Sequence, residues 1–321
     1  MTTLARLYQD RELYTPSNTT FCPPSERRSH VVRFELTTGC NWGRCTYCDG
    51  YQDVSFDEKD IEDYREHVDT VFKRMDPCNR SDLRRVFIGG GNALGVETPK
   101  LHEAIQYAGS RFGHHVRMKP KRTSVYGRTD SINEQGRKGL RRLYNRSGEF
   151  GLDLIYWGVE TGSDDVLAYV KKGCTHDDIV EAGREVREAD VKTSVMIMPG
   201  LGGIRFYDQH VEATAEVLGA IRPEFLTFMG VNPGERTAYT KTMAREERKG
   251  KNRPLTDREM AEQMIAIIDS MPVWNVKVGC FPPDVDAVGH NPLTFNSYGM
   301  YDAYGKRELV IKLRRKVQRI E

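Results

Sequence analysis

The sequence lacks long hydrophobic runs, a secretory signal and a strong net charge. No stretch approaches the roughly 20 apolar residues that a membrane-spanning helix needs. The opening MTTLARLYQDRELY has no apolar core of the kind that directs secretion. The 48 Lys and Arg residues nearly balance 46 Asp and Glu residues, so the formal net charge is +2 and no global basic field points to nucleic acid. We therefore expect a cytoplasmic location, with neither a membrane nor nucleic acid as a partner.

A disulfide framework is also missing. The seven cysteines are an odd number, and without a secretory signal they do not indicate paired disulfides. Three of them, Cys40, Cys45 and Cys48, lie within nine residues, whereas the other four are scattered. Thiolates this close can bind one metal centre, and their softness favours iron–sulfur or zinc. Structural zinc and ferredoxin clusters normally take four protein ligands, and no fourth Cys or His follows nearby. Three cysteines would leave one iron of a cubane cluster open to another ligand.

The hydrophobic pattern predicts a regular alternation of strands and helices from residue 31 onward. Six strand candidates occupy residues 31–36, 85–88, 122–126, 153–158, 192–198 and 224–230. Helical periodicity follows them, for example over residues 57–75. This order predicts an α/β fold, a parallel (β/α)6 partial TIM barrel. Ligands of such folds lie at the carboxyl ends of the strands, and every motif considered below follows a predicted strand.

Composition divides the chain into three predicted parts. Residues 1–30 are polar and form an N-terminal extension, and residues 31–235 form the barrel. Residues 236–321 are predicted to be a C-terminal lid and capping segment. Within it, the charged stretch 236–254 has the composition of a mobile loop, a helix is expected over 256–271, and the end is a basic helix.

The cysteine segment Cys40-Asn41-Trp42-Gly43-Arg44-Cys45-Thr46-Tyr47-Cys48 resembles the signature of the radical S-adenosylmethionine (SAM) superfamily. The resemblance implies a 4Fe–4S cluster on Cys40, Cys45 and Cys48, whose open iron binds the amino and carboxylate groups of SAM. The reduced cluster would cleave SAM, and the resulting 5′-deoxyadenosyl radical would abstract hydrogen from a substrate. Four residues separate Cys40 from Cys45, one more than is usual in the family. Gly43 can absorb the extra residue in an unusual backbone conformation.

Two further segments carry the resemblance, which extends over roughly residues 32 to 232. Gly89-Gly90-Gly91-Asn92 is similar to the family's glycine motif, whose backbone meets the amino group of SAM. Gly158-Val159-Glu160 is similar to a segment whose glutamate accepts hydrogen bonds from the ribose hydroxyls.

The remaining site residues are likewise implied by the resemblance. Arg187, with Arg184 as the alternative, would reach the SAM carboxylate. Met198 and Leu201 belong to a loop that would flank the adenine, and Tyr47 would lie against the adenine edge. Lys171-Lys172-Gly173 also matches the family pattern.

Within the superfamily, the sequence is most similar to a loosely characterised group related to oxygen-independent coproporphyrinogen oxidases. Those enzymes have a fourth cysteine where this chain has Asp49-Gly50, so porphyrin decarboxylation is not expected. Cys78, Cys174 and Cys280 are too far apart in sequence to suggest a second cluster.

The substrate is not identified by the sequence and is expected to be a small molecule or a peptide. Candidate pocket residues are Arg128, Met196, Phe228 and His290, and Cys280 is expected near the pocket. An electron donor such as ferredoxin or flavodoxin is the expected protein partner. Two alternatives stay open, namely an electron-transfer or sensory iron–sulfur protein without SAM chemistry and a zinc-stabilised RNA-binding protein.

Overall fold

The computed structural model describes residues 23–26, 30–51, 54–144, 150–280 and 295–318. These residues form two compact units. The first unit contains the chain up to Gly43, Gly50–Tyr156 and Glu185–Lys192. The second contains Arg44–Asp49, Trp157–Arg184 and the chain from Thr193 onward. The described part of the chain has no helix long and apolar enough to cross a membrane.

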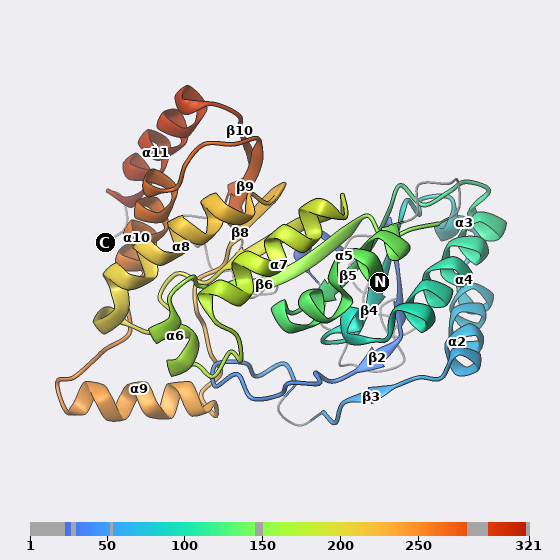
Figure 1. The fold of residues 1–321 in the computed structure, drawn as a ribbon, viewed down its shortest axis with the longest axis horizontal. Coiled ribbons are helices and arrows are strands. Elements are labelled where there is room, and N and C mark those ends of the chain that lie inside the picture. The colour runs from blue at the N-terminus through green and yellow to red at the C-terminus, as the bar shows by residue number, and fades with distance from the viewer. Residues whose placement is uncertain (1–22, 27–29, 52–53, 145–149, 281–294, 319–321) are drawn as a thin grey trace, which may run out of the picture. The chain divides into compact units, whose positions relative to one another are not determined.

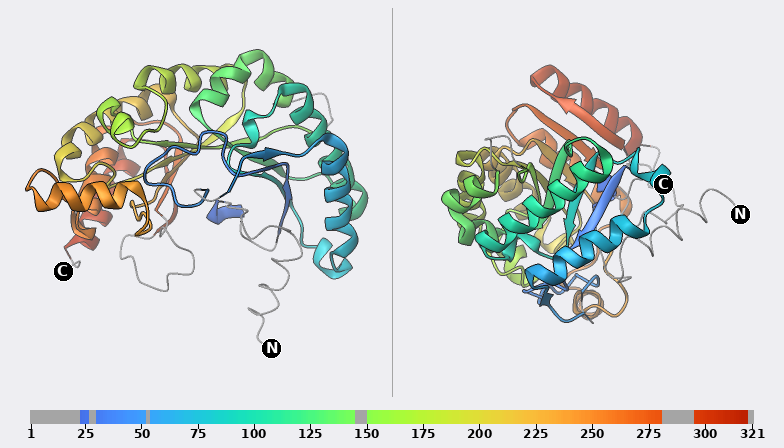
Figure 2. Two further views of the ribbon diagram at one scale, coloured as in Figure 1. Left: turned by 90° about the horizontal axis from the view of Figure 1, so that it is seen from below. Right: turned by 90° about the vertical axis from the view of Figure 1, so that its right-hand side faces the viewer.

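Three parallel strands form the centre of the first unit: β1 (Val31–Glu35), β4 (Arg85–Gly89) and β5 (Arg122–Gly127). Val31 is in register with Arg85, and Arg85 with Arg122. The helices α2 (Ile61–Arg74), α4 (Thr98–Val116) and α5 (Thr129–Tyr144) follow these strands along the chain and lie outside them (Figure 1, Figure 2). Shorter elements are η1 (Pro24–Glu26), β2 (Thr37–Thr38), β3 (Asp57–Glu58), α3 (Pro77–Arg80) and η2 (Ala93–Gly95).

Helix α2 illustrates how the sequence specifies these elements. Asp60 precedes it, and its side chain accepts a hydrogen bond from the Asp63 N–H at 2.8 Å, which satisfies a free donor of the first turn. Every third or fourth residue is then apolar and buried, as the periodicity predicts. The buried apolar residues of α2 are Tyr64, Val68, Val71 and Phe72.

Strand β6 (Leu154–Glu160) contributes to both units, with Leu154–Tyr156 in the first and the rest in the second. In the second unit β7 (Lys192–Ile197), β8 (Phe225–Phe228) and β9 (Val276–Cys280) run parallel, and β10 (Phe295–Met300) pairs antiparallel with β9. The helices of this unit are α6 (Asp164–Tyr169), α7 (His176–Glu188), α8 (Tyr207–Ile221), α9 (Ala238–Arg248), α10 (Asp257–Ser270) and α11 (Ala303–Val317), with the short η3 (Ile204–Phe206) before α8.

The predicted fold class is confirmed. The strands follow the order β1-β4-β5-β6-β7-β8-β9-β10, all six predicted strands are present, and helices alternate with them. This is the α/β arrangement of a parallel partial TIM barrel. The predicted helix over 256–271 is also present as α10, which begins with a capping box formed by Thr256 and Glu259.

The prediction of a mobile loop over residues 236–254 is wrong, because residues Ala238–Arg248 form helix α9. Thr237 caps the helix by accepting a hydrogen bond from the Thr240 N–H, and Tyr239 and Met243 are buried one turn apart. Most of the charged residues lie at exposed positions of a packed helix. The part of the chain after residue 235 also adds β9, which pairs in parallel with β8. The predicted boundaries at residues 30 and 235 and the lid role stay predictions.

Candidate functional site

The chain leading to Cys40 packs against the glycine motif in the first unit. The Gly91 N–H donates to the Gly39 carbonyl at 2.8 Å. A Cβ added to Gly90 would overlap the Thr37 Oγ1 atom, and one added to Gly91 would overlap the Gly39 carbonyl oxygen. From the sequence, these glycines are expected to allow the close approach of a ligand. In the structure, glycine is also required here by the close approach of the cysteine segment itself, while Gly89 is the buried last residue of β4.

Replacing Gly90 by Ala should therefore disturb the cysteine loop. Gly90 has a φ of +121°, and the added methyl group would collide with Thr37, so the segment before Cys40 must shift. We expect Gly90→Ala to lower the iron content after reconstitution by half or more. Gly250→Ala is the matched control, since Gly250 also has positive φ (+63°) but nothing lies within 4 Å of its added Cβ. Equal iron content in both variants would contradict the role of this contact.

Asn92, at the end of the glycine motif, holds the residue after Cys40. It is completely buried, and its Nδ2 group donates to Asn41 Oδ1 at 3.0 Å and to Ser131 Oγ at 2.7 Å. Its Oδ1 atom accepts the Arg128 N–H at 3.1 Å. Both amide hydrogens are therefore used inside the protein. A direct contact between Asn92 and SAM stays a prediction, whereas the hydrogen bond by which Asn92 holds Asn41 is present in the structure.

Arg128, a predicted pocket residue, supports the next residue of the same loop. Its guanidinium carbon lies 5.1 Å from the centre of the Trp42 ring, a cation–π arrangement. Asp130 fixes that guanidinium through a two-pronged pair, with Nε–Oδ1 and Nη2–Oδ2 distances of 3.1 Å each. Arg128 is buried and thus acts on the loop through packing as well as charge.

The second half of the loop, Arg44–Asp49, belongs to the second unit. The Thr46 N–H donates to the Val170 carbonyl at 2.9 Å, and the Thr46 carbonyl accepts the Tyr239 N–H at 3.0 Å. Thr46 is thereby held between the ends of α6 and α9. Cys45 and Cys48 flank it, and the Cys48 N–H donates to the Cys45 carbonyl at 3.2 Å in a tight turn.

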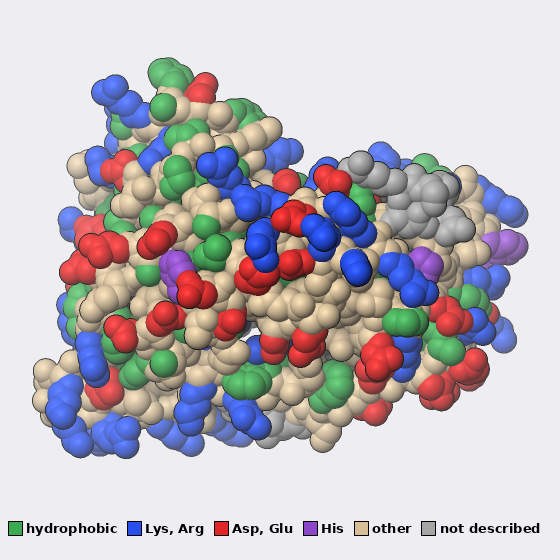
Figure 3. Space-filling model, in the orientation of Figure 1, with side chains coloured by type: hydrophobic (Ala, Val, Ile, Leu, Met, Phe, Trp, Pro, Cys, Tyr) green, Lys and Arg blue, Asp and Glu red, His purple; other side chains and the backbone are tan. Residues whose placement is uncertain are grey.

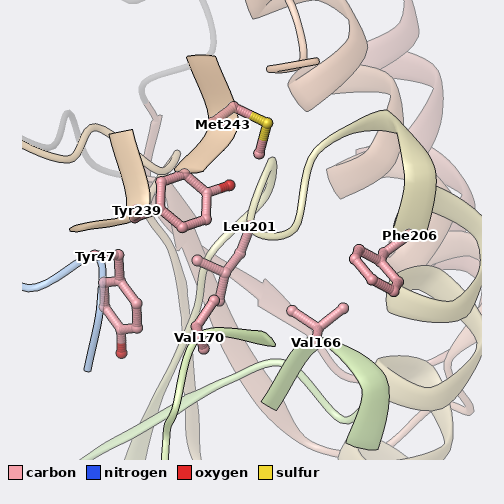
Figure 4. Packing of buried hydrophobic residues seen from close by; sticks show 7 residues of the cluster. All are labelled: Tyr47, Val166, Val170, Leu201, Phe206, Tyr239 and Met243. Carbon is pink, nitrogen blue, oxygen red and sulfur yellow. The ribbon is translucent and has the colours of Figure 1, made fainter. Parts of the chain in front are cut away.

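A cluster of buried hydrophobic residues supports Cys45 and Cys48. Cys45, Cys48 and Met198 are partly buried and pack against it. In Figure 4, Tyr47 and Tyr239 lie on one side of Leu201, and Phe206 lies on the other. The cluster consists of Tyr47, Val166, Val170, Leu201, Phe206, Tyr239 and Met243.

Glu160 and Tyr47 are joined by a buried lysine. The Lys172 Nζ atom lies 3.0 Å from Glu160 Oε1 and donates to the Tyr47 hydroxyl at 3.3 Å. Glu160 is 3% exposed and Lys172 5% exposed, so the ion pair is almost completely withdrawn from water. Burial, followed by the negative charge of Glu160, raises the pKa of Tyr47 well above its usual value. The tyrosine therefore stays protonated and can donate to a further acceptor.

The second oxygen of Glu160 is the most informative atom of the site. Oε2 is buried and has no hydrogen-bond partner in the part of the chain that the structure describes. Glu160 also has a φ of +67°, which is strained for a residue with a side chain and is typical of functional sites. Gly158 makes room for the carboxylate, because a Cβ there would lie 2.5 Å from Glu160 Oε1. An unsatisfied buried carboxylate oxygen fits a ligand that brings hydroxyl donors.

The inward position of Lys172 follows from the way α6 ends. The Lys172 N–H donates to the Leu167 carbonyl at 2.9 Å, and the Lys171 N–H donates to the Ala168 carbonyl at 3.1 Å. This pair of bonds is a Schellman motif, with Lys171 in the left-handed conformation at φ +55°. Lys171 is exposed as a result and Lys172 is buried. Both lysines match the family pattern in sequence, but the sequence does not show that Lys172 is the one that lies in the site.

Met198 lies beside Glu160, and Leu201 belongs to the same packed group. The Met198 N–H donates to the Glu160 carbonyl at 2.9 Å, and the Leu201 N–H donates to the Met198 carbonyl at 3.2 Å. Leu201 is completely buried, whereas Met198 is partly exposed and is the one of the two that a ligand can reach.

Arg187 is exposed on α7 and belongs to the first unit, as does its neighbour Glu188, which pairs with Arg137 at 2.7 Å. Arg184, the alternative, pairs with Glu181 on the surface of the same helix. The predicted contact of either arginine with SAM stays a prediction.

The other pocket candidates differ in accessibility. Cys280, the last residue of β9, is buried, and burial raises the pKa of its thiol to about 12, so the thiol stays protonated. Phe228 is completely buried, and Met196 is partly exposed. His290 lies outside the described residues.

Cys40, Cys45 and Cys48 are partly exposed and lie outside any disulfide among the described residues, which suits metal uptake. Across the described ranges, no three Cys, His, Asp or Glu side chains are gathered tightly enough to form a finished metal site. Cys78, Cys174 and Cys280 likewise lie outside any disulfide there. Three thiolates in one short loop suit an iron–sulfur cluster, and their joint binding of one stays a prediction.

Comparison with known proteins supports this chemistry. A family model described as Radical SAM superfamily matches residues 34–218. A putative methylthiotransferase of Methanocaldococcus jannaschii is 23% identical over 175 residues, which cover 52% of this chain and 34% of that protein. This chain thus spans about a third of the length of that curated relative.

Solved structures with similar folds have low sequence identity. The radical SAM methyltransferase TsrM of Kitasatospora setae, with cobalamin and a 4Fe–4S cluster bound, is 15% identical with a TM-score of 0.48, over 67% of this chain and 36% of that one. The archaeal Elp3 of Methanocaldococcus infernus is also 15% identical with a TM-score of 0.48, over 89% of this chain and 62% of that one. Neither likeness defines a function. Because the family model covers more than half of the 321 residues and includes all three cysteines, the chain belongs to the radical SAM superfamily.

Proposed function

We propose that Cys40, Cys45 and Cys48 hold one 4Fe–4S cluster and that SAM binds with its ribose on Glu160. Radical SAM enzymes use this cluster and SAM as cofactors, and reductive cleavage of SAM supplies a 5′-deoxyadenosyl radical that removes hydrogen from a substrate. For this chain we propose a small-molecule or peptide substrate. The described cysteines outside the loop form no second ligand group, which favours a single cluster.

The carboxylate of Glu160 carries this proposal. Its Oε2 atom is buried without a partner among the described residues, and a ribose diol would supply the missing donors. Lys172 compensates the buried negative charge through Oε1 and leaves Oε2 for the ligand. The strained φ of +67° at Glu160 adds support, because such conformations are concentrated at functional sites. An electron-transfer or sensory iron–sulfur protein would need the cysteines but not this carboxylate.

Tyr47 links the ribose side of the site to a cysteine ligand. Its hydroxyl accepts a hydrogen bond from Lys172 at 3.3 Å, and the nearby Cys45 side chain contributes to its raised pKa. A hydrogen bond to a ligating sulfur stabilises the extra negative charge of a reduced cluster. Glu160, Lys172 and Tyr47 thus form one connected chain of polar contacts in the second unit, and Cys45 lies near its Tyr47 end.

Removal of the Tyr47 hydroxyl should lower the reduction potential of the cluster. Tyr47→Phe keeps the ring in the hydrophobic cluster but removes the hydroxyl dipole near Cys45, so the reduced state loses stabilisation. A redox titration followed by electron paramagnetic resonance (EPR) measures the shift. Tyr239→Phe is the control, because the Tyr239 hydroxyl accepts the Gly202 N–H and donates to the Gly200 carbonyl. A potential that is unchanged in Tyr47→Phe would rule out this tuning.

We also propose that this protein is related to oxygen-independent coproporphyrinogen oxidases but does not decarboxylate a porphyrin. Asp49 takes the place of the fourth cysteine of those enzymes and lies against Gly234, where an added Cβ would be 2.7 Å from Asp49 Oδ2. We also propose a ferredoxin or flavodoxin as the electron donor and the cytoplasm as the location.

Binding of SAM at the cluster separates this function from the electron-transfer alternative. We expect the EPR spectrum of the reduced, reconstituted protein to change when SAM is added. Glu160→Gln should require at least tenfold more SAM for the same change, since loss of a charge-assisted contact is worth about 1.5–3 kcal/mol. A spectrum that is identical with and without saturating SAM would favour an electron-transfer or sensory protein.

A further inference from the structure

Helix α9 carries a dense set of basic side chains on its outer face. Lys241, Arg245 and Arg248 are spaced by four and three residues and therefore project from the same side of the helix. Lys249 and Lys251 follow directly, and all five are exposed. We call this set the α9 basic face. In Figure 3, Lys and Arg side chains form a row along the lower edge of the molecule, where Figure 1 shows α9.

The charges of the α9 basic face lie in solvent. None of its five side chains has an ion-pair partner within the described ranges. Glu246, in the same helix, is turned inward, where its Oε2 atom accepts hydrogen bonds from the Tyr169 hydroxyl at 2.9 Å and from Asn252 Nδ2 at 3.2 Å. The helix thus uses one of its acidic side chains for internal packing and leaves the basic ones in solvent, with Glu247 as the exposed exception.

The inner face of the same helix packs on the cysteine loop. The Tyr239 N–H donates to the Thr46 carbonyl at 3.0 Å, directly between Cys45 and Cys48. Tyr239 and Met243 belong to the hydrophobic cluster against which Cys45 and Cys48 are packed. One helix therefore separates two of the cluster ligands from an unpaired positive surface.

We propose that the α9 basic face is the docking site of an acidic one-electron donor protein. Opposite charges steer two proteins together and raise the association rate by about 10- to 1,000-fold. In the docked complex one electron leaves the reduced donor and enters the cluster, so the donor is oxidised by one electron and no proton has to move. This docking role presupposes SAM cleavage at the cluster and in that respect rests on the proposed function.

The other basic helix of the second unit is used differently. On α11, Lys306 donates to the Met271 carbonyl at 2.7 Å, and Arg314 pairs with Asp269 at 2.8 Å. These residues fasten α11 to the end of α10. Arg307 and Arg315 are exposed on α11 and provide a matched control, because their replacement changes the net charge by the same amount as replacement of two α9 arginines.

The test compares Arg245→Glu/Arg248→Glu with Arg307→Glu/Arg315→Glu in reconstituted enzyme. SAM cleavage is driven either by dithionite or by a flavodoxin that its reductase keeps reduced. With dithionite, all three proteins should cleave SAM at the same rate. With limiting flavodoxin at low salt, the α9 variant should be slower by about tenfold or more, while the α11 variant should match the wild type. The defect should shrink as salt rises, because about 0.1 M salt screens charges beyond about 10 Å.

Equal flavodoxin-driven rates in all three proteins would overturn the docking site, as would a defect of the same size in the α11 variant. If the α9 variant alone instead lost affinity for a short single-stranded RNA, with flavodoxin kinetics unchanged, the surface would be a nucleic-acid site. If the α9 variant were also inactive with dithionite, the wild-type enzyme alone would serve for the test. Its flavodoxin concentration for half-maximal rate of SAM cleavage must then rise with salt, and a constant concentration would overturn the docking site. Absence of SAM cleavage by the wild type with dithionite would instead refute the proposed function.

Discussion

Replacing Cys40, Cys45 and Cys48 together by Ala is expected to reduce bound iron from about four atoms per chain to fewer than one. The three cysteines are partly exposed in one short loop, and the others are scattered along the sequence. Soft thiolates are the only side chains in the loop that bind iron in a cubane cluster. SAM cleavage should disappear together with the iron. Iron and acid-labile sulfide analysis after anaerobic reconstitution measures this.

Exposed Cys78 and half-buried Cys174 supply the control for this experiment. The variant Cys78→Ala/Cys174→Ala should retain the full iron content, because both cysteines lie far from the cysteine loop in sequence and from each other. If the triple variant kept half or more of its iron, a second iron–sulfur centre would exist. If the control lost iron instead, the ligand assignment would be wrong.

The second large effect is expected at the buried pair of Glu160 and Lys172. Glu160→Ala removes the carboxylate that we propose binds the ribose, and it leaves the Lys172 ammonium buried without its counter-charge. Breaking such a pair costs about 3–5 kcal/mol of the free energy of unfolding. The same variant should bind SAM about tenfold to more than a hundredfold more weakly, from the loss of a charge-assisted contact worth about 1.5–3 kcal/mol.

A double variant separates these two effects. Lys172→Met alone should also be destabilised, because it leaves the Glu160 carboxylate buried and unpaired. The double variant Glu160→Gln/Lys172→Met contains no buried charge at this position and should recover most of the lost stability. It should not recover SAM binding, since the acceptor for the ribose hydroxyls is weakened. Chemical denaturation and equilibrium SAM binding measure the two quantities. Recovery of both together would mean that Glu160 acts on SAM only through the fold.

The strands and the cysteine loop could be predicted because their signals are local. Buried parallel strands appear in the sequence as short apolar runs, and all six runs form strands in the structure. The three cysteines and the Gly158–Glu160 segment are likewise contiguous. Tyr47, Glu160 and the loop with Met198 and Leu201 are three separate segments, yet the structure brings them together in the second unit.

What could not be predicted depends on backbone conformation and on long-range contacts. Only the left-handed conformation of Lys171 decides that Lys172 turns into the site, and two adjacent lysines look alike in a sequence. Asn92 holds Asn41, which lies 51 residues earlier in the chain. The helical spacing of Tyr239 and Met243 is hidden among the charged residues of α9, so composition alone suggested a loop.

The products formed from SAM by the reduced, reconstituted enzyme test the account most directly. After anaerobic addition of dithionite and SAM, chromatography should detect 5′-deoxyadenosine and methionine in equal amounts from the wild type. The same products should be absent from the Cys40→Ala/Cys45→Ala/Cys48→Ala variant. Intact SAM in the wild-type reaction despite a fully loaded and reduced cluster, or S-adenosylhomocysteine as the sole product, would contradict radical cleavage of SAM by this protein.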